Sequence, residues 1–266
     1  MGVGELDGVG WTSLVTLHLR ALDARSAHPL LADAWAVPAL ERLRASGADV
    51  DSPWLAATSG DRDLVALRAA QLDAWAAEVL RADPDVTVLH LGCGLDSRGL
   101  RLGAGPRWIE VDTPDVADVR RALYPGAPGR VVASSVTDPA WLADLGGPRV
   151  LVVAEGLLMY LSAAEVQALL ERITARFEHG DVLFDVVAPW VVRVSGSLPA
   201  VYGAFAMHWA PRGPDEVRAL APALRFGEAV DVLSLADRIT SPGRRWAYRG
   251  VRRILPGSTR LTRWTF

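Results

Sequence analysis

The chain has 266 residues, half of them hydrophobic, and a formal net charge of −3 at pH 7. This length suits one large domain with an added cap, or two small domains. The slight negative charge gives no general attraction to nucleic acid or to an anionic membrane. The sequence contains one cysteine and no lysine, which argues against an intrachain disulfide, a multi-cysteine metal cluster, Schiff-base chemistry and a P-loop.

No uninterrupted apolar run is close in length to the roughly 20 residues that a membrane-spanning helix needs. The first ten residues lack the basic start and the apolar stretch of a secretory signal, so we expect a cytoplasmic protein.

Residues 11–82 have apolar positions at helical spacing and predict a helical segment. From residue 86 onwards, short apolar runs alternate with helical patterns near 95–102, 114–123, 139–145 and 162–178. The runs, typical of buried strands, are Val86–Leu91, Trp108–Val111, Arg130–Ser134, Val150–Ala154 and Val182–Val187. This alternation predicts an α/β fold with a parallel sheet covered on both faces, whose ligands bind at the carboxyl ends of the strands.

The alternation of apolar runs and helical patterns ends after Val187. Residues 189–211 are rich in aromatic residues, too long for an ordinary loop and too apolar to be disordered, so we interpret them as a cap over the site. Residues 226–233 and 260–266 then predict a terminal hairpin that closes the sheet.

A glycine turn follows the first expected strand. Gly92 and Gly94 permit a tight turn and a close approach of the backbone to a ligand. A dinucleotide fingerprint needs a third glycine at position 97, where this chain has Ser97, so a nicotinamide-dependent oxidoreductase is the less favoured alternative. A plain strand-to-helix turn is the other interpretation.

Acidic residues close the second and fourth expected strands. Asp112 is placed to accept hydrogen bonds from ribose hydroxyls, although it could also cap the helix beginning at Pro114. Glu155 would be costly to bury without a cationic partner, and the ammonium and sulfonium groups of S-adenosylmethionine are natural partners. The next helix already has a cap in Ser162 with Glu165, so Glu155 is not needed there. Asp138 before Pro139 indicates an ordinary helix cap.

Three motifs in this order and spacing resemble the leucine carboxyl methyltransferase family, within it the bacterial O-methyltransferases of polyketide pathways of the tetracenomycin type. The motifs are the run from Val88 to Leu102, the Glu110-Val-Asp112-x-Pro114 segment, and the run Glu155-Gly-Leu-Leu-Met-Tyr-Leu161. The resemblance covers residues 60–188 well and is weaker in the N-terminal helices and the cap.

The resemblance implies a class I S-adenosylmethionine-dependent methyltransferase with a seven-stranded, mostly parallel sheet. It further implies an N-terminal helical lid over residues 1–82 and a core over residues 83–266. The core carries a cap insertion, residues 189–212, after the fifth strand.

The family's cofactor contacts carry over by position. Arg68 would pair the methionine carboxylate, Asp112 the ribose, and Glu155 the methionine amine. Ser135 and Val136 stand where the family often has an Asp-Leu pair that meets the adenine. The residues thus expected to bind the cofactor are Arg68, Gly92, Gly94, Asp112, Ser135, Val136 and Glu155. Asp96 and Arg98 would brace the loop, while His90 and Cys93 are expected to be core and turn residues.

The expected reaction is O-methylation of a small natural product, aromatic or polyketide, at a carboxylate or an acidic phenol. A carboxylate is already ionised and needs no general base, whereas a phenol would use a base such as His208, with Tyr160 beneath the acceptor. The residues expected to contact the acceptor are Tyr160, Trp190, Arg193, Tyr202, Phe205, Met207, His208 and Trp209, with Arg212 as an alternative cation. Plain packing of the insertion and a non-catalytic protein of the same fold are the open alternatives. The oligomeric state is not predicted.

Overall fold

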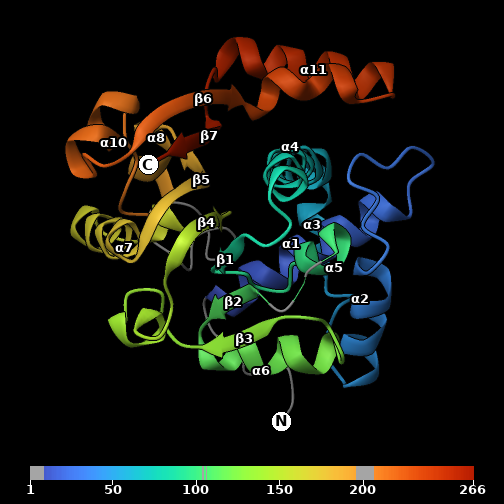
Figure 1. The fold of residues 1–266 in the computed structure, drawn as a ribbon. Coiled ribbons are helices and arrows are strands. Elements are labelled where there is room, and N and C mark those ends of the chain that lie inside the picture. The colour runs from blue at the N-terminus through green and yellow to red at the C-terminus, as the bar shows by residue number, and fades with distance from the viewer. Residues whose placement is uncertain (1–8, 104, 106, 196–206) are drawn as a thin grey trace.

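The computed structural model describes residues 9–103, 105, 107–195 and 207–266. A seven-stranded sheet runs through the molecule in the order β3-β2-β1-β4-β5-β7-β6 (Figure 1). The first five strands pair in parallel, and β7 is antiparallel to both β5 and β6. The strands are β1 (Thr87–Leu91), β2 (Trp108–Asp112), β3 (Arg130–Ala133), β4 (Gly147–Ala154), β5 (Phe177–Val187), β6 (Arg225–Asp231) and β7 (Thr259–Thr265). The predicted seven-stranded, mostly parallel sheet is therefore confirmed.

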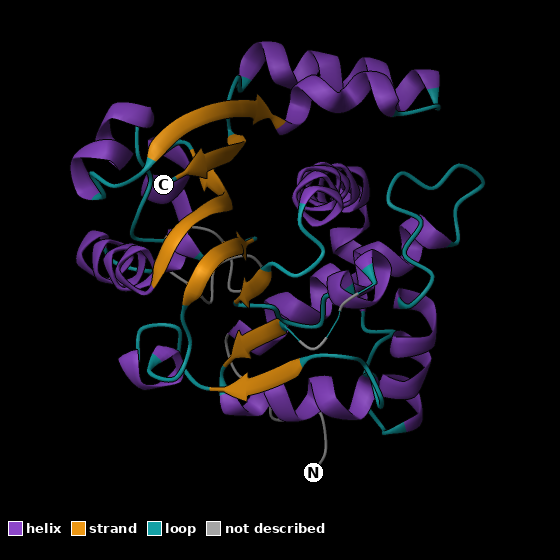
Figure 2. Cartoon of the chain, viewed as in Figure 1, coloured by secondary structure: helices purple, strands orange, loops and turns teal. Residues whose placement is uncertain are grey.

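Helices lie on both sides of the sheet, as the colouring by secondary structure shows (Figure 2). The α-helices are α1 (Val9–Ala24), α2 (Ala36–Ala45), α3 (Pro53–Ala57), α4 (Arg62–Ala82), α5 (Arg98–Leu102), α6 (Pro114–Leu123), α7 (Ala163–Arg176), α8 (Pro189–Ser195), α10 (Pro214–Leu220) and α11 (Pro242–Ile254). The 3₁₀ helices are η2 (Thr58–Asp61), η3 (Pro139–Leu142), η4 (Leu158–Tyr160) and η5 (Val232–Arg238).

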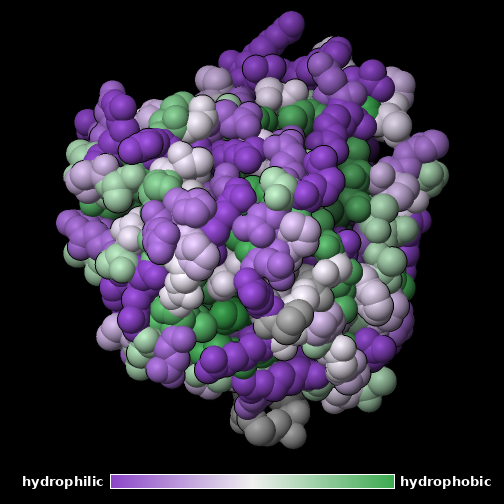
Figure 3. All heavy atoms as spheres, in the orientation of Figure 1, coloured by the Kyte–Doolittle hydropathy of each residue, from purple (hydrophilic) through white to green (hydrophobic). Residues whose placement is uncertain are grey.

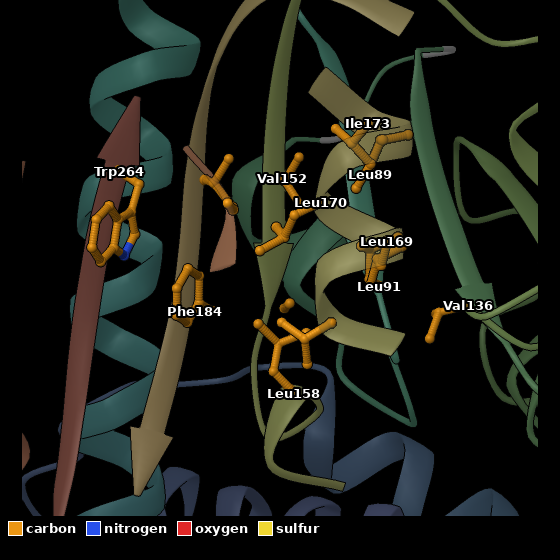
Figure 4. Packing of buried hydrophobic residues seen from close by; sticks show 14 of the residues in the cluster. Leu89, Leu91, Val136, Val152, Leu158, Leu169, Leu170, Ile173, Phe184 and Trp264 are labelled. Atoms are coloured by element: carbon orange, nitrogen blue, oxygen red, sulfur yellow. The ribbon is translucent and has the colours of Figure 1, made fainter. Parts of the chain in front are cut away.

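Alternate residues of each central strand pack on opposite faces of the sheet, because side chains of a strand point to opposite sides. In β4, Val152 belongs to a cluster with Leu169 and Ile173 of α7 (Figure 4), whereas Leu151 packs with α4. Phe184 of β5 and Trp264 of β7 stack on the α7 side, with ring centroids 6.1 Å apart. The continuous apolar runs thus reflect burial on both faces.

A third cluster joins the N-terminal helices to the core. Leu17 of α1, Leu40 of α2 and Leu55 of α3 are fully or almost fully buried and pack with residues of the glycine-turn segment and of α6. Helices α1, α2 and α3 are therefore attached beside the glycine turn, whereas α4 packs on one face of the sheet.

Two helix starts follow the sequence closely. Ser162 and Glu165 form a complete capping box at the start of α7. The Asp138 carboxylate accepts the N–H of Ala140 ahead of Pro139, as predicted, although the helix it caps is only the single 3₁₀ turn η3.

The C-terminal strands differ from the expected hairpin. β6 and β7 do pair antiparallel, but η5 and α11 separate them in the chain. Val232 and Leu233, expected in a strand, begin η5 because the Asp231 carboxylate accepts the N–H of Leu233 and turns the backbone. Within the described residues, none of the helices is long and apolar enough to cross a membrane. The face in Figure 3 mixes hydrophilic and hydrophobic residues.

Candidate active site

The glycine turn directly follows β1 and has a backbone that requires glycine. Gly92 and Gly94 have φ values of 57° and 51°, in the left-handed region that residues with a Cβ rarely adopt. A Cβ on Gly92 would lie 2.8 Å from Leu157 Cδ1, and one on Gly94 would lie 3.0 Å from Ser13 Cβ. The turn therefore packs closely between the loop after β4 and helix α1.

Asp112 holds this turn in place from the end of the neighbouring strand. Its Oδ2 accepts the N–H of Gly94 over 2.6 Å, and its Oδ1 accepts the N–H of Thr113 over 2.8 Å. Thr113, not Asp112, is the N-cap residue of α6, so the helix-cap interpretation of Asp112 does not describe its position. Burial raises the pKa of Asp112, against the opposing effect of the two N–H donors.

Glu155 closes β4 and lies among three arginines. Its Oε1 accepts the Nε–H of Arg68 over 2.9 Å, its Oε2 accepts an N–H of Arg98, and Arg20 Nη2 lies 3.5 Å from Oε1. Burial by itself would raise the pKa of Glu155, but Arg68, Arg98 and Arg20 outweigh it and hold the pKa well below its ordinary value. The carboxylate is therefore ionised at neutral pH.

Asp185, near the end of β5, was not predicted as a site residue. It is fully buried, accepts the N–H of Gly156 over 2.6 Å, and accepts Arg68 Nη1–H over 3.1 Å. Burial raises its pKa, while Arg68 opposes the shift. The only signal in the sequence was an acidic residue inside the apolar run Val182–Val187, where an unpaired charge would be costly.

Asp96 connects the turn to the surrounding helices, as its predicted bracing role requires. Its Oδ1 accepts the N–H of Arg98 and an N–H of Arg101, and its Oδ2 lies 3.3 Å from Arg20 Nη2. The connected buried cluster contains five carboxylates and four guanidiniums, which leaves one negative charge. Its members are Asp33, Asp73, Asp96, Glu155, Asp185, Arg20, Arg68, Arg98 and Arg101.

Glu110 and Arg120 form a second buried pair below the turn. Arg120 donates to both oxygens of the Glu110 carboxylate and also to the backbone carbonyls of Gly94 and Asp96. Beside it, burial lowers the pKa of His90, and the neutral ring lies edge-on to Trp108. His90 and Cys93 are buried at the turn, where the sequence placed them.

A cavity of about 570 Å³ opens where β1, β2, β4 and β5 end. All seven residues predicted to bind the cofactor line it, namely Arg68, Gly92, Gly94, Asp112, Ser135, Val136 and Glu155. The N-terminal helix α1 contributes Ser13, Thr16 and Arg20 to the same wall. Residues predicted from separate motifs are thus brought to one space.

Part of the cavity wall is largely aliphatic, and we call these residues the apolar half. The apolar half consists of Val15, Leu64, Val65, Met159, Leu161, Val187, Val191, Met207, Val232 and Leu233. Tyr160 and Asp61 are polar members of this wall. Burial raises the pKa of both side chains, so the Tyr160 phenol stays protonated at neutral pH.

Several residues predicted to contact the acceptor lie elsewhere. Among the described residues, Trp190, Arg193, His208, Trp209 and Arg212 are not part of the cavity wall, whereas Tyr160 and Met207 are. The His208 side chain is exposed. Its backbone N–H donates to the carbonyl of Met159 over 2.7 Å and attaches this segment to η4.

Trp209 is buried in the core next to Phe184, with ring centroids 6.2 Å apart, and so is a packing residue of the sheet. Tyr202 and Phe205 lie outside the described residues.

The order of strands, the glycine turn after β1 and the acidic ends of β2 and β4 together define a class I methyltransferase fold. The structure is similar to that of a DUF574 family protein of Streptomyces avermitilis, with 15% identity over 81% of this chain and 90% of that chain and a TM-score of 0.55. It is also similar to a protein of Thermobifida fusca named as a methyltransferase, with 16% identity over 92% and 93% of the two chains and a TM-score of 0.54. These structural similarities establish the fold of the chain.

The chain belongs to the leucine carboxyl methyltransferase family, whose sequence profile matches residues 13–174. It is 40% identical, over 98% of both chains, to the tetracenomycin polyketide synthesis O-methyltransferase TcmP of Streptomyces glaucescens. It is 34% identical to an S-adenosyl-L-methionine-dependent methyltransferase of Gibberella zeae, over 91% of this chain and 88% of the relative. The protein is therefore an S-adenosylmethionine-dependent methyltransferase, and the nicotinamide alternative is set aside.

Proposed function

We propose that this enzyme methylates an oxygen of a small natural product, aromatic or polyketide, and that the oxygen belongs to a carboxylate or, failing that, to an acidic phenol. The observation that carries this proposal is that one cavity wall combines the charged cluster with the aliphatic residues of the apolar half. The name of the relative TcmP supports a polyketide acceptor.

The glycine turn fits the cofactor because its tight left-handed backbone presents main-chain atoms to the cavity. Gly92 and Gly94 bring bare backbone to the cavity wall. Asp112 lies beside them, and a carboxylate that accepts two backbone N–H groups keeps lone pairs for ribose hydroxyls. Ser135 and Val136 line the next strand end, where the adenine would lie.

The charge of the buried cluster is complementary to that of the cofactor. Five carboxylates against four guanidiniums leave one negative charge. S-adenosylmethionine carries an ammonium, a sulfonium and a carboxylate, and so one net positive charge. A buried cluster with a charge imbalance is stabilised by a ligand of the opposite sign.

Arg68 is the residue suited to the methionine carboxylate. Its Nε and Nη1 donate to Glu155 and Asp185, while its Nη2 makes no hydrogen bond within the described part of the chain. The side chain is 18% exposed and lies on the cavity wall, so the N–H groups of Nη2 can donate to a ligand carboxylate. Asp185 fixes the guanidinium in that orientation.

When bound, the cofactor would supply an electrophilic methyl group on a sulfonium, whose sulfur leaves as a neutral thioether as the acceptor oxygen bonds to the methyl carbon in line. The chain's task is to hold that oxygen about 3 Å from the methyl group and to exclude water. The apolar half binds the body of the acceptor, and the protonated Tyr160 hydroxyl donates toward its oxygen. A carboxylate acceptor is already ionised, so no residue needs to remove a proton.

The experiment is a methyl-transfer assay with isotopically labelled S-adenosylmethionine and two acceptors, an aromatic polyketide acid and its analogue without the carboxyl group. We expect label only in the acid, as a methyl ester that mild alkali hydrolyses. Label that survives alkali would identify a phenolic ether. Absence of label from both acceptors, with intact cofactor binding, would contradict the proposed acceptor class.

A further inference from the structure

Helix α11 has an unusual surface. None of its 13 residues is buried, although helices this short generally depend on packing for stability. Among the described residues, six large hydrophobic side chains are exposed, and four of them belong to α11 or to the residue after it: Trp246, Val251, Ile254 and Leu255. Trp246 and Ile254 are 78% and 79% exposed. Such a concentration of exposed apolar groups indicates a binding surface.

The opposite side of the helix is attached to the protein. Arg244 Nε donates to Asp63 over 2.7 Å, and one turn later the Tyr248 hydroxyl donates to the carbonyl of Gly60 over 3.0 Å. Helical geometry places Trp246 opposite these contacts and Ile254 about 80° round the helix from Trp246, about 12 Å further along the axis. Both side chains are exposed, and we call this side the outer face. Figure 1 shows α11 at the edge of the molecule, beyond β6.

The outer face is bordered by positive charge. Residues 242–255 contain five arginines and no acidic residue, although the whole chain has a net charge of −3. Arg249 and Arg252 form ion pairs with Asp237 and Asp231, and Arg244 is paired with Asp63. Arg253 makes no hydrogen bond or ion pair within the described residues. Pairing of this helix with its copy in a second chain would bring arginines together, so the charge favours an anionic partner.

We propose that α11 binds an anionic lipid surface as a peripheral contact. An exposed helix with arginine on its flanks and Trp246 and Ile254 on its outer face has the composition of an interfacial helix. The arginines would contact lipid phosphates, and the two apolar side chains would enter the boundary with the acyl chains. The net charge of the chain gives no general attraction, so the contact depends on this local concentration of arginine.

The position of α11 relates this surface to the cavity. Val232 and Leu233, which precede α11, and Ser258 and Thr259, which follow it, all line the cavity. A lipid surface held by α11 would therefore lie beside the apolar half, where a hydrophobic acceptor is expected. Only this last consequence rests on the proposed function; the lipid contact itself does not.

The test is sedimentation of the full chain with vesicles of phosphatidylcholine alone or with added phosphatidylglycerol. We expect binding to the anionic vesicles at about 0.05 M salt and at least a tenfold weaker affinity at about 0.5 M, where screening shortens the range of the charges. The double variant Trp246→Ser/Ile254→Ser should lose at least about tenfold in affinity for the vesicles, because both apolar groups are removed. Arg253→Glu should also weaken binding.

Matched controls are Trp35→Ser, which removes an exposed tryptophan at the start of α2, and Arg225→Glu, which reverses an exposed charge on β6. Both should bind like the unaltered protein. The proposal is overturned if the unaltered protein does not bind anionic vesicles at low salt, or if the double variant binds equally well. It is also overturned if light scattering shows a dimer that the double variant converts to a monomer.

Discussion

Arg68 and Glu155 are 87 positions apart in the sequence, yet the Nε–H of Arg68 donates to Oε1 of Glu155 over 2.9 Å. This contact joins α4, which precedes the sheet, to the end of its central strand β4. Glu155 also accepts from Arg98 of α5 and lies near Arg20 of α1, so one carboxylate connects α1, α4 and α5.

Glu155→Gln should therefore affect both stability and cofactor binding. Loss of the charge leaves three arginines without their shared partner, and we expect the free energy of unfolding to fall by about 3 kcal/mol. The affinity for S-adenosylhomocysteine should fall by about tenfold or more, measured by titration calorimetry at a temperature where the variant is folded. Glu171→Gln on the exposed side of α7 is the control, and an unchanged affinity in Glu155→Gln would count against the assignment.

Glu110 gives a prediction for pH. Burial would raise its pKa, but Arg120 and His90 outweigh this and lower the pKa from 4.5 to about 2. Ionised Glu110 therefore stabilises the fold above about pH 4.5, and this contribution, about 3 kcal/mol, is lost as the pH falls from 4.5 to 2. Urea unfolding of Glu110→Gln should show a deficit at neutral pH that narrows in acid.

The matched control for this titration is Glu178→Gln, an exposed position on β5. Its stability should follow that of the unaltered protein at every pH. A deficit in Glu110→Gln that stays constant from pH 7 to about pH 2 would mean that the pair with Arg120 does not lower the pKa.

Asp61→Asn separates the two acceptor classes. Asp61 lines the apolar half, and a carboxylate there repels a carboxylate acceptor. With such an acceptor, we expect kcat to stay within about threefold and KM to fall. A hundredfold loss of kcat with recovery at higher pH would instead show that Asp61 takes a proton from a phenol. Asp49→Asn, at an exposed position, is the control.

His208→Ala should leave turnover nearly unchanged, because His208 is exposed and the described cavity wall does not include it. Steady-state kinetics across a range of pH is the measurement. A drop of about a hundredfold, recovered at high pH, would show that the histidine reaches the acceptor and acts as a base.

The local features of this protein follow from its sequence. The buried strands are visible as continuous apolar runs because both faces of the sheet are covered, and the cap of α7 is visible because Ser162 and Glu165 act within one turn. The glycine turn and the acids closing β2 and β4 could be placed near one another because parallel strands end at one edge of a sheet.

The tertiary structure decided what depends on distant contacts. Arg20 and Asp61 line the cavity only because α1 and η2 converge there, and Asp185 of β5 acts indirectly, by pairing with Arg68 on the cavity wall. Aromatic composition predicted Trp209 at the acceptor, but packing against Phe184 placed it in the core. Local pattern fixes which residues form strands, turns and caps, whereas long-range packing fixes which way a side chain faces, and so which residues can touch a ligand.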